Sequence, residues 1–178
     1  ALDDIGDIYC WGEGTDGRLG DDDDSDNLVP TKIVDPDGEP DKKWKRVAAG
    51  VSHSCAIDLA DAVYCWGSNS SGALGDGSNT TSFKPVPVSV SGIGSPTFIE
   101  LAAGGGFTCA ISSANDAYCW GDNSDGKLGI ASMDSTRDVP AAVAGDLKFQ
   151  KISANFDHAC GITMTGDAYC WGRGTHGR

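Results

Sequence analysis

The seven cysteines and three histidines are the side chains of this chain with the greatest capacity for chemistry. His53 and His158 each stand two residues before a cysteine, a spacing that would suit a nucleophile with its base or a pair of metal ligands. At the equivalent place in the middle of the chain stands Phe107. Because one position accepts phenylalanine and histidine alike, we interpret it as a packing position and predict no catalytic residue.

Six of the cysteines form three pairs with the same spacing of 10 residues. An even spacing across a hairpin turn puts two residues opposite one another on one face, within reach of a disulfide. The sequence therefore predicts the bridges Cys55–Cys65, Cys109–Cys119 and Cys160–Cys170. Reduced, buried cysteines and zinc ligands are the alternatives, although the chain has no CxxC motif.

The redox state of these cysteines bears on the compartment. Disulfides would indicate an extracellular, periplasmic, cell-surface or lumenal protein, whereas reduced cysteines would indicate the cytoplasm or nucleus. We expect the oxidising alternative. The first residues lack the basic and apolar regions of a signal peptide, and no stretch is apolar for long enough to span a membrane, so we expect no membrane insertion.

Acidic side chains are the other possible source of a site. The formal net charge of −13 argues against a nucleic acid partner, because binding to phosphates needs clustered lysine and arginine. The run Asp21, Asp22, Asp23 and Asp24 is a weak metal candidate and is more typical of a solvated loop. Asp122 to Gly126 resembles the start of a calcium loop, but Met133 stands where such a loop has glutamate. We predict no metal site.

Two segments, Gly12 to Gly17 and Gly172 to Gly177, match the GxGxxG pattern of dinucleotide-binding proteins. The middle glycine of that pattern is replaced by Asn69 and Asn123 in the equivalent segments, an exchange that indicates a left-handed turn. We therefore expect no nucleotide and no other cofactor. Asn69-Ser-Ser and Asn79-Thr-Thr fit the pattern for N-glycosylation.

The elements that position these side chains belong to a repeat. The tetrapeptide Tyr-Cys-Trp-Gly occurs four times, with cysteines 55, 54 and 51 residues apart. A Leu-Gly pair follows the first three copies at a fixed distance, which divides the chain into repeats at about 1–20, 21–75, 76–129 and 130–178. A period near 50 residues is typical of propellers and solenoids. We expect the repeated residues to pack within or between the units: Trp11, Gly20, Trp66, Gly75, Trp120, Gly129 and Trp171.

Each repeat contains about four short apolar segments, the content of one propeller blade. Three equivalent strands end at Gly50, Gly104 and Asn155, residue types that tolerate the left-handed conformation, which suggests a turn with positive φ at each. The spacing varies elsewhere, and there we expect exposed loops: 21–26, 35–43, 89–97 and 130–138. The chain is thus predicted to be all-β, a single partial propeller domain over 1–178 with about 3 to 3.5 blades.

The partner of Cys10 would stand immediately before Ala1, so Cys10 is expected to be unpaired by truncation. The last repeat also stops before its Leu-Gly pair. We expect a piece of a longer protein, with the remaining blades as one of its partners. A piece of this kind exposes unpaired strand edges and apolar faces at both ends, so we expect it to self-associate or to be only marginally stable alone.

The segment Trp66 to Gly75, preceded by Ala-Ala-Gly and His-Ser-Cys-Ala-Ile segments, resembles the repeat of the regulator of chromosome condensation family. The resemblance extends over nearly the whole chain and implies a propeller, with seven blades in the parent protein. The founding member of that family exchanges nucleotide on a small GTPase and contacts chromatin. The paired cysteines and the acidic charge of this chain depart from such an intracellular member.

We therefore expect a non-enzymatic, secreted or surface-exposed propeller that binds another protein through its variable loops. A guanine-nucleotide exchange factor or other regulator of a small GTPase is the first alternative, and free thiols would favour it. The second is an enzyme whose site is completed by further blades.

Overall fold

The computed structural model describes residues 1–90 and 92–175 of the chain. His176 and Gly177, the end of the second GxGxxG match, lie outside the described residues. The described part contains thirteen strands and two 3₁₀ turns: β1 (Tyr9–Gly12), η1 (Thr15–Gly17), β2 (Asn27–Lys32), β3 (Trp44–Ala49), β4 (His53–Asp58), β5 (Val63–Gly67), β6 (Ser82–Pro87), β7 (Phe98–Ala103), β8 (Phe107–Ser112), β9 (Ala117–Asp122), η2 (Ser124–Gly126), β10 (Thr136–Ala142), β11 (Phe149–Ala154), β12 (His158–Thr163) and β13 (Ala168–Gly172). The prediction of an all-β chain is confirmed.

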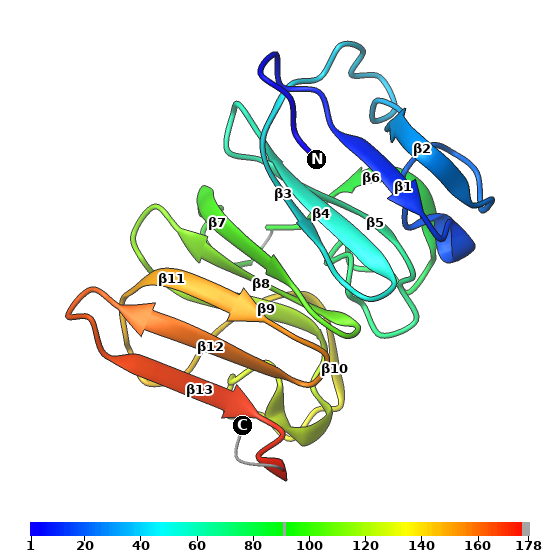
Figure 1. Ribbon diagram of the computed structural model, residues 1–178. Coiled ribbons are helices and arrows are strands. Elements are labelled where there is room, and N and C mark those ends of the chain that lie inside the picture. The colour runs from blue at the N-terminus through cyan, green and yellow to red at the C-terminus, as the bar shows by residue number, and fades with distance from the viewer. Residues whose placement is uncertain (91, 176–178) are drawn as a thin grey trace.

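The strands form four separate antiparallel sheets. Two have four strands, in the orders β3-β4-β5-β6 and β7-β8-β9-β10, and they are flanked by β1-β2 and by β11-β12-β13. Figure 1 shows these sheets following one another along a fan, with the two termini at its opposite ends. Each sheet contacts the next mainly through its first strands, since β7 packs against β3 and β4, and β11 packs against β7 and β8.

The sheets are out of step with the sequence repeats. The segment 21–75, bounded by Leu-Gly pairs, supplies β2 to one sheet and β3, β4 and β5 to the next. Successive repeats are therefore linked by backbone hydrogen bonds as well as by side-chain packing. Of the expected loops, 130–138 is shorter than predicted because β10 begins at Thr136.

The core lies between sheets rather than within one. One buried cluster combines Cys55 and Ile57 of the first four-stranded sheet with Phe98, Leu101 and Trp120 of the second. Two further clusters fill the two neighbouring interfaces in the same way. Because each sheet buries its faces on its neighbours, no single repeat has a core of its own, as expected of stacked repeats.

A tryptophan of one repeat seats on the Leu-Gly pair of the preceding repeat. Trp66 and Trp120 are fully buried, and their indole N–H groups donate to the carbonyl oxygens of Arg18 and Ala73 at 3.1 and 2.9 Å. A Cβ on Gly75 would stand 2.6 Å from Nε1 of Trp120, and Gly75 has a φ of +69°. Only glycine satisfies both the backbone conformation and the close approach of the ring.

The prediction of a positive φ at Gly50, Gly104 and Asn155 is wrong, because none of the three lies in the left-handed region. The two glycines are required by close approach between sheets instead. A Cβ on Gly50 would stand 2.6 Å from the carbonyl oxygen of Gly104, and one on Gly104 would stand 2.5 Å from that of Asn155. Small residues thus let the turns at the inner edge lie directly against one another.

The prediction of a left-handed turn at the middle position of the GxGxxG segments is also wrong. Gly14 and Asn123 have φ values of −94° and −108°, and Asn69 is not left-handed either. The asparagine is explained by its side chain: Oδ1 of Asn69 accepts from the Leu74 N–H at 3.0 Å, and its Nδ2 donates to the Ser78 carbonyl at 3.0 Å. The amide therefore holds the turn closed from inside.

We expect Gly75→Ala to lower the free energy of unfolding by about 2–4 kcal/mol, because it adds backbone strain to a clash with a fixed indole ring. Gly38→Ala is the matched control, since Gly38 has a φ of +77° but a Cβ at that position would meet no other atom within 4 Å; it should cost about 1 kcal/mol. Urea unfolding of both variants measures the difference, and equal losses would contradict the seating of the tryptophan on glycine.

Candidate functional site

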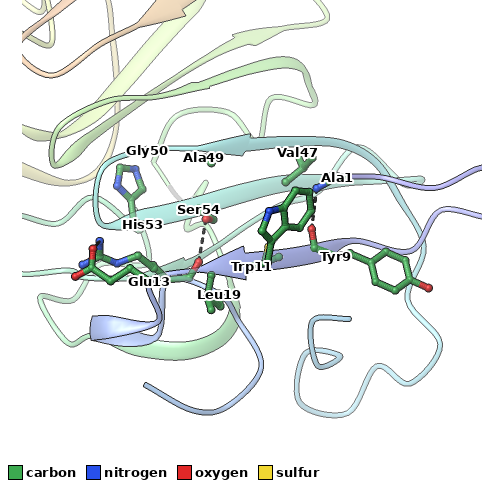
Figure 2. Close-up of a pocket in the computed structure, with 12 residues that line it drawn as sticks. Ala1, Tyr9, Trp11, Glu13, Leu19, Val47, Ala49, Gly50, His53 and Ser54 are labelled. Carbon is green, nitrogen blue, oxygen red and sulfur yellow. Dashed lines mark hydrogen bonds and ion pairs between the residues drawn. The ribbon is translucent and has the colours of Figure 1, made fainter. Parts of the chain in front are cut away.

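A groove of about 420 Å³ lies between β1 and the first four-stranded sheet. Its walls are mainly apolar, and Figure 2 shows Trp11 rising from β1 toward the strand that carries Val47, while Tyr9 points away. The remaining lining residues come from the turn after β1 and from the facing sheet: Ala1, Cys10, Glu13, Arg18, Leu19, Ala49, Gly50, His53 and Ser54. The groove brings together three groups weighed in the sequence, namely Cys10, Trp11 and His53.

Trp11 departs from the expectation that the repeated tryptophans are packed. Its exposed fraction is 51%, whereas Trp66 and Trp120 are fully buried. Trp171 is half-buried, and a Cβ on Gly129 would stand 2.9 Å from its ring, but its buried Nε1 has no hydrogen-bond partner among residues 1–90 and 92–175. The two tryptophans of the inner sheets thus lie over a glycine and make an indole hydrogen bond. Trp171 lies over a glycine without that hydrogen bond, and Trp11 is exposed.

The imidazole of His53 is held in one orientation by the next sheet. Its Nε2 lies 2.8 Å from Oγ1 of Thr108, whose own proton goes to the carbonyl oxygen of Ala73 at 2.9 Å. Thr108 must therefore accept, so Nε2 carries the hydrogen, and Nδ1 is a buried acceptor without a partner in the part of the chain that the structure describes. Burial lowers the pKa of His53 to about 4, which keeps the ring neutral near pH 7.

The other reactive groups of the groove are equally unsuited to catalysis. Burial raises the pKa of the Cys10 thiol, which disfavours the nucleophilic thiolate. Oγ of Ser54 donates its proton to the Arg18 carbonyl at 3.0 Å, and the guanidinium of Arg18 is occupied by Glu13 and by the Val51 carbonyl. Among the described residues of the groove, these groups do not form a nucleophile with its base, and the walls around them are mainly apolar.

The three cysteine pairs lie in the middle of their sheets. Each pair is directly opposite in the register of the hairpin, with S–S distances of 2.11, 2.06 and 2.08 Å. The first two pairs are fully buried, whereas Cys170 of the third is exposed. Cys10, on the corresponding strand β1, is half-buried and unpaired. The structure thus pairs the cysteines in the combination that the spacing predicts.

The acidic segments use their carboxylates locally. Asp21 accepts from the side chain of Asn27, and Asp23 accepts from the backbone and hydroxyl of Ser25. Asp122 pairs with Lys127 at 2.6 Å, which lowers the pKa of its carboxyl against the opposing effect of burial. Within residues 1–90 and 92–175, no group of three or more metal-ligating side chains is close enough to hold an ion.

The segment after Gly12 contains only the three-residue turn η1 and continues into an antiparallel strand. A dinucleotide fingerprint requires a helix and a parallel sheet at this point, so the structural context of that motif is missing. Of the two glycosylation patterns, Asn69 is buried with its amide group hydrogen-bonded, whereas Asn79 is exposed. In the part of the chain that the structure describes, no helix is long and apolar enough to cross a membrane.

Sequence reasoning missed a charged cluster at the opposite end of the first four-stranded sheet. The ammonium group of Lys42 contacts Asp58 at 2.8 Å, the hydroxyl of Tyr64 at 2.7 Å and the carboxylate of Glu39. Burial alone would lower the pKa of Lys42, but the two carboxylates outweigh it and raise that pKa. The only signal in the sequence is Asp58, since Ser112 and Thr163 stand at the equivalent positions.

Comparison with known proteins places these features in a family. The family model described as "Regulator of chromosome condensation (RCC1) repeat" matches residues 6–57 and 61–111, and a second family model of the same description matches 44–73, 98–127 and 149–178. The ultraviolet-B receptor UVR8 of Arabidopsis thaliana is 30% identical over 179 residues, which are all of this chain and 40% of that protein. The human E3 ubiquitin-protein ligase HERC2 is 31% identical over 183 residues, 4% of its length.

Solved structures of the same fold match nearly the whole chain. Human WBSCR16 superposes with a TM-score of 0.87 at 21% identity, over 99% of this chain and 45% of that one. Prp20p of Saccharomyces cerevisiae superposes with a TM-score of 0.79 at 25% identity, over 98% of this chain and 43% of that one. The prediction of a partial β-propeller with about three blades is confirmed. The chain spans less than half the length of these proteins.

We expect His53 to make stability depend on pH between about 4 and 6.5. The pKa of its ring is about 4 when folded, below the ordinary value of 6.5, so the unfolded chain takes up a proton first as pH falls. Stability should be complete above pH 6.5 and decline by on the order of 3 kcal/mol by pH 4 through this residue. His53→Phe, which copies Phe107, should remove that part of the slope in urea unfolding; an unchanged slope would contradict a buried neutral ring.

Proposed function

The chain belongs to the regulator of chromosome condensation (RCC1) repeat family, and on that basis we propose that it is a non-enzymatic scaffold that binds another protein through its loops. One observation carries the proposal. The side chains with capacity for chemistry are engaged in holding the sheets together, whereas the loops after each Leu-Gly pair differ from repeat to repeat. A rigid framework with variable loops is the usual design of a binding protein.

Three of these loops make a natural set for recognition. Each has six residues and follows Gly20, Gly75 or Gly129, and the three read DDDDSD, DGSNTT and IASMDS. Because they connect the equivalent strand pairs β1 to β2, β5 to β6 and β9 to β10, all three lie at the same end of their sheets. Their exposed side chains include Asp22, Asn79 and the fully exposed Met133. The set therefore offers acidic, polar and apolar contacts along one rim.

The charge of the chain indicates the chemistry of the partner. Residues 1–41 contain 14 of the 26 acidic residues but only 2 of the 13 basic ones. A field of this sign favours a basic protein surface and makes association sensitive to salt. Prp20p is described by its binding to Gsp1p and histones, and a second structure holds it with Kap60. These relatives support a protein partner for this fold.

The cysteine pairs support a location in an oxidising compartment, which we propose to be outside the cell, in the periplasm, at the cell surface or in a lumen. Disulfides persist there and are reduced in the cytosol. The alternative function, nucleotide exchange on a small GTPase, would place the chain in a reducing compartment. These cysteines would then be free thiols.

Peptide mass spectrometry of the non-reduced protein from its native compartment tests the location. We expect the three links Cys55–Cys65, Cys109–Cys119 and Cys160–Cys170. Graded reduction should open Cys160–Cys170 first, because Cys170 is exposed while the other two pairs are buried. Free thiols at all six of these cysteines in freshly alkylated cells would instead support the reducing compartment.

A loop exchange tests the function. Replacing residues 21–25 by DGSNT keeps Asp21, which accepts from Asn27, and Asp26, which accepts from the Gly14 N–H at 3.0 Å, and removes the other three negative charges of the loop. We expect this variant to lose a partner that the original chain captures from its native compartment, by about tenfold or more in affinity, and to unfold at the same urea concentration.

A second variant, with DDDDSD in place of residues 130–135, is the control for loop position. Partner binding that survives every exchange would contradict recognition through these loops. A second assay addresses the alternative: the chain should not accelerate release of labelled GDP from a small GTPase, and a clear acceleration would replace the scaffold by an exchange factor.

A further inference from the structure

Two segments of the chain, Asn69-Ser-Ser and Asn79-Thr-Thr, match the acceptor motif for N-linked glycosylation. Both lie between β5 and β6 of the same sheet. A glycan is bulky and hydrophilic, so a folded protein carries it only on an asparagine whose amide group faces solvent. The surroundings of the two amide groups therefore distinguish the two motifs.

The amide group of Asn69 is enclosed by its own turn. The side chain is fully buried. Its Nδ2 donates to the carbonyl oxygen of Ser78 at 3.0 Å and to Oδ1 of Asp76 at 3.2 Å. A sugar on Nδ2 would displace these acceptors and would need space inside a closed turn, which leaves buried polar groups unpaired. A chain that carries a glycan on Asn69 is therefore incompatible with this fold.

Asn79 stands just beyond that turn, and its side chain faces solvent. Asn79 and Thr80 are both exposed, and neither belongs to a strand or a helix. The amide group of Asn79 makes no hydrogen bond to any residue in the ranges 1–90 and 92–175. A sugar on its Nδ2 would displace water only, so the folded chain can carry a glycan here.

The backbone around Asn79 is held in place from both sides. Before it, the Gly77 N–H donates to the Asp138 carbonyl of the next sheet at 2.9 Å. After it, Ser82 begins β6. None of these backbone contacts involves the side chain of residue 79. A glycan at Asn79 would thus extend from a fixed point on the rim without disturbing the contact between sheets.

Comparison between repeats separates the two asparagines further. Asn123 stands at the position of Asn69 and closes its own turn through its amide group, so asparagine at that position is explained by the turn. The residues at the position of Asn79 are Asp24 and Met133, and both are exposed. The fold leaves this position open in each repeat and does not require asparagine there.

We propose that Asn79 is an acceptor for N-linked glycosylation and that Asn69 is not modified in the folded chain. The donor is an oligosaccharide joined to a membrane lipid through a diphosphate. Nδ2 of Asn79 bonds to C1 of the first sugar, and the bond from C1 to the diphosphate oxygen breaks. The lipid diphosphate leaves, and the proton lost from Nδ2 is taken up by a base of the transferring enzyme. The inference rests on the proposed location, specifically on passage through a lumen.

A glycan at Asn79 would refine the proposed recognition surface. The loop that carries it connects β5 to β6, and the sheets on either side carry the loops from β1 to β2 and from β9 to β10 (Figure 1). Carbohydrate at the middle of the rim would keep a flat protein surface from covering all three loops at once. A partner would then contact the acidic residues 21–26 or the residues 130–135 beside the glycan.

Peptide mass spectrometry of the protein from its native compartment, before and after treatment with peptide N-glycosidase, tests the proposal. We expect an oligosaccharide on Asn79, an unmodified Asn69 and the three disulfides in the same molecules. Disulfide-bonded protein without sugar on Asn79 would overturn this inference and leave the proposed location standing. Free thiols at the six paired cysteines would overturn the location, and the inference with it. Sugar on Asn69 in folded protein would also overturn the inference.

Variants secreted from a eukaryotic host separate the two motifs. Thr81→Ala removes the hydroxyl that the motif needs and keeps Asn79, so the glycosylated species should be lost completely. Thr81→Ser should restore it. Ser71→Ala is the matched control, because it removes the other motif and leaves the buried amide of Asn69 in place, so the glycan should be unchanged. Retention of the glycan in Thr81→Ala, or its loss in Ser71→Ala, would overturn the proposal, and equal urea midpoints of the two alanine variants after glycan removal exclude misfolding.

Discussion

The contact of an indole ring with the glycine of the preceding repeat is the constraint on which this structure depends. Trp66 and Trp120 lie over glycines that leave no room for a side chain, and each closes the contact with a hydrogen bond to a carbonyl nearby. The same carbonyls accept from Ser54 and Thr108. A few atoms thus fix the distance, the rotation and the hydrogen bonding of one sheet relative to the next, and the buried clusters between sheets follow from that spacing.

The same constraint engages the reactive side chains of the inner sheets in packing. The only N–H of the His53 ring donates to Thr108 of the neighbouring sheet. Ser54 donates its proton to the Arg18 carbonyl, which also accepts from the indole of Trp66. The cysteines of the inner sheets are bridged and buried. Polar groups in a buried interface must be hydrogen-bonded to be tolerated, so here their bonding capacity serves the packing of sheets. Variation is left to the loops at the rim.

Much of the fold could be predicted from the sequence because comparing the repeats with one another distinguishes constant positions from variable ones. Four copies of Tyr-Cys-Trp-Gly at nearly constant spacing separate framework from loop, and the equal spacing of Cys55–Cys65 and its two counterparts is sufficient to align a hairpin. Comparison between repeats gave a wrong prediction where the exchanged residue could act through its side chain as well as through its backbone. The exchange of glycine for asparagine at residues 14 and 69 suggested backbone conformation, but the side-chain amide of Asn69 was the cause.

The sequence by itself determined the strand content, the hairpin register and the pairing of cysteines, because these depend on residues close together in the chain. The tertiary structure decided what depends on the neighbouring repeat: that Gly50 and Gly104 serve close approach rather than a turn, and that Trp11 is exposed while Trp66 is buried. The physical reason is that a repeat protein buries its side chains between units, and the atoms that meet there are separated by about a whole repeat of sequence.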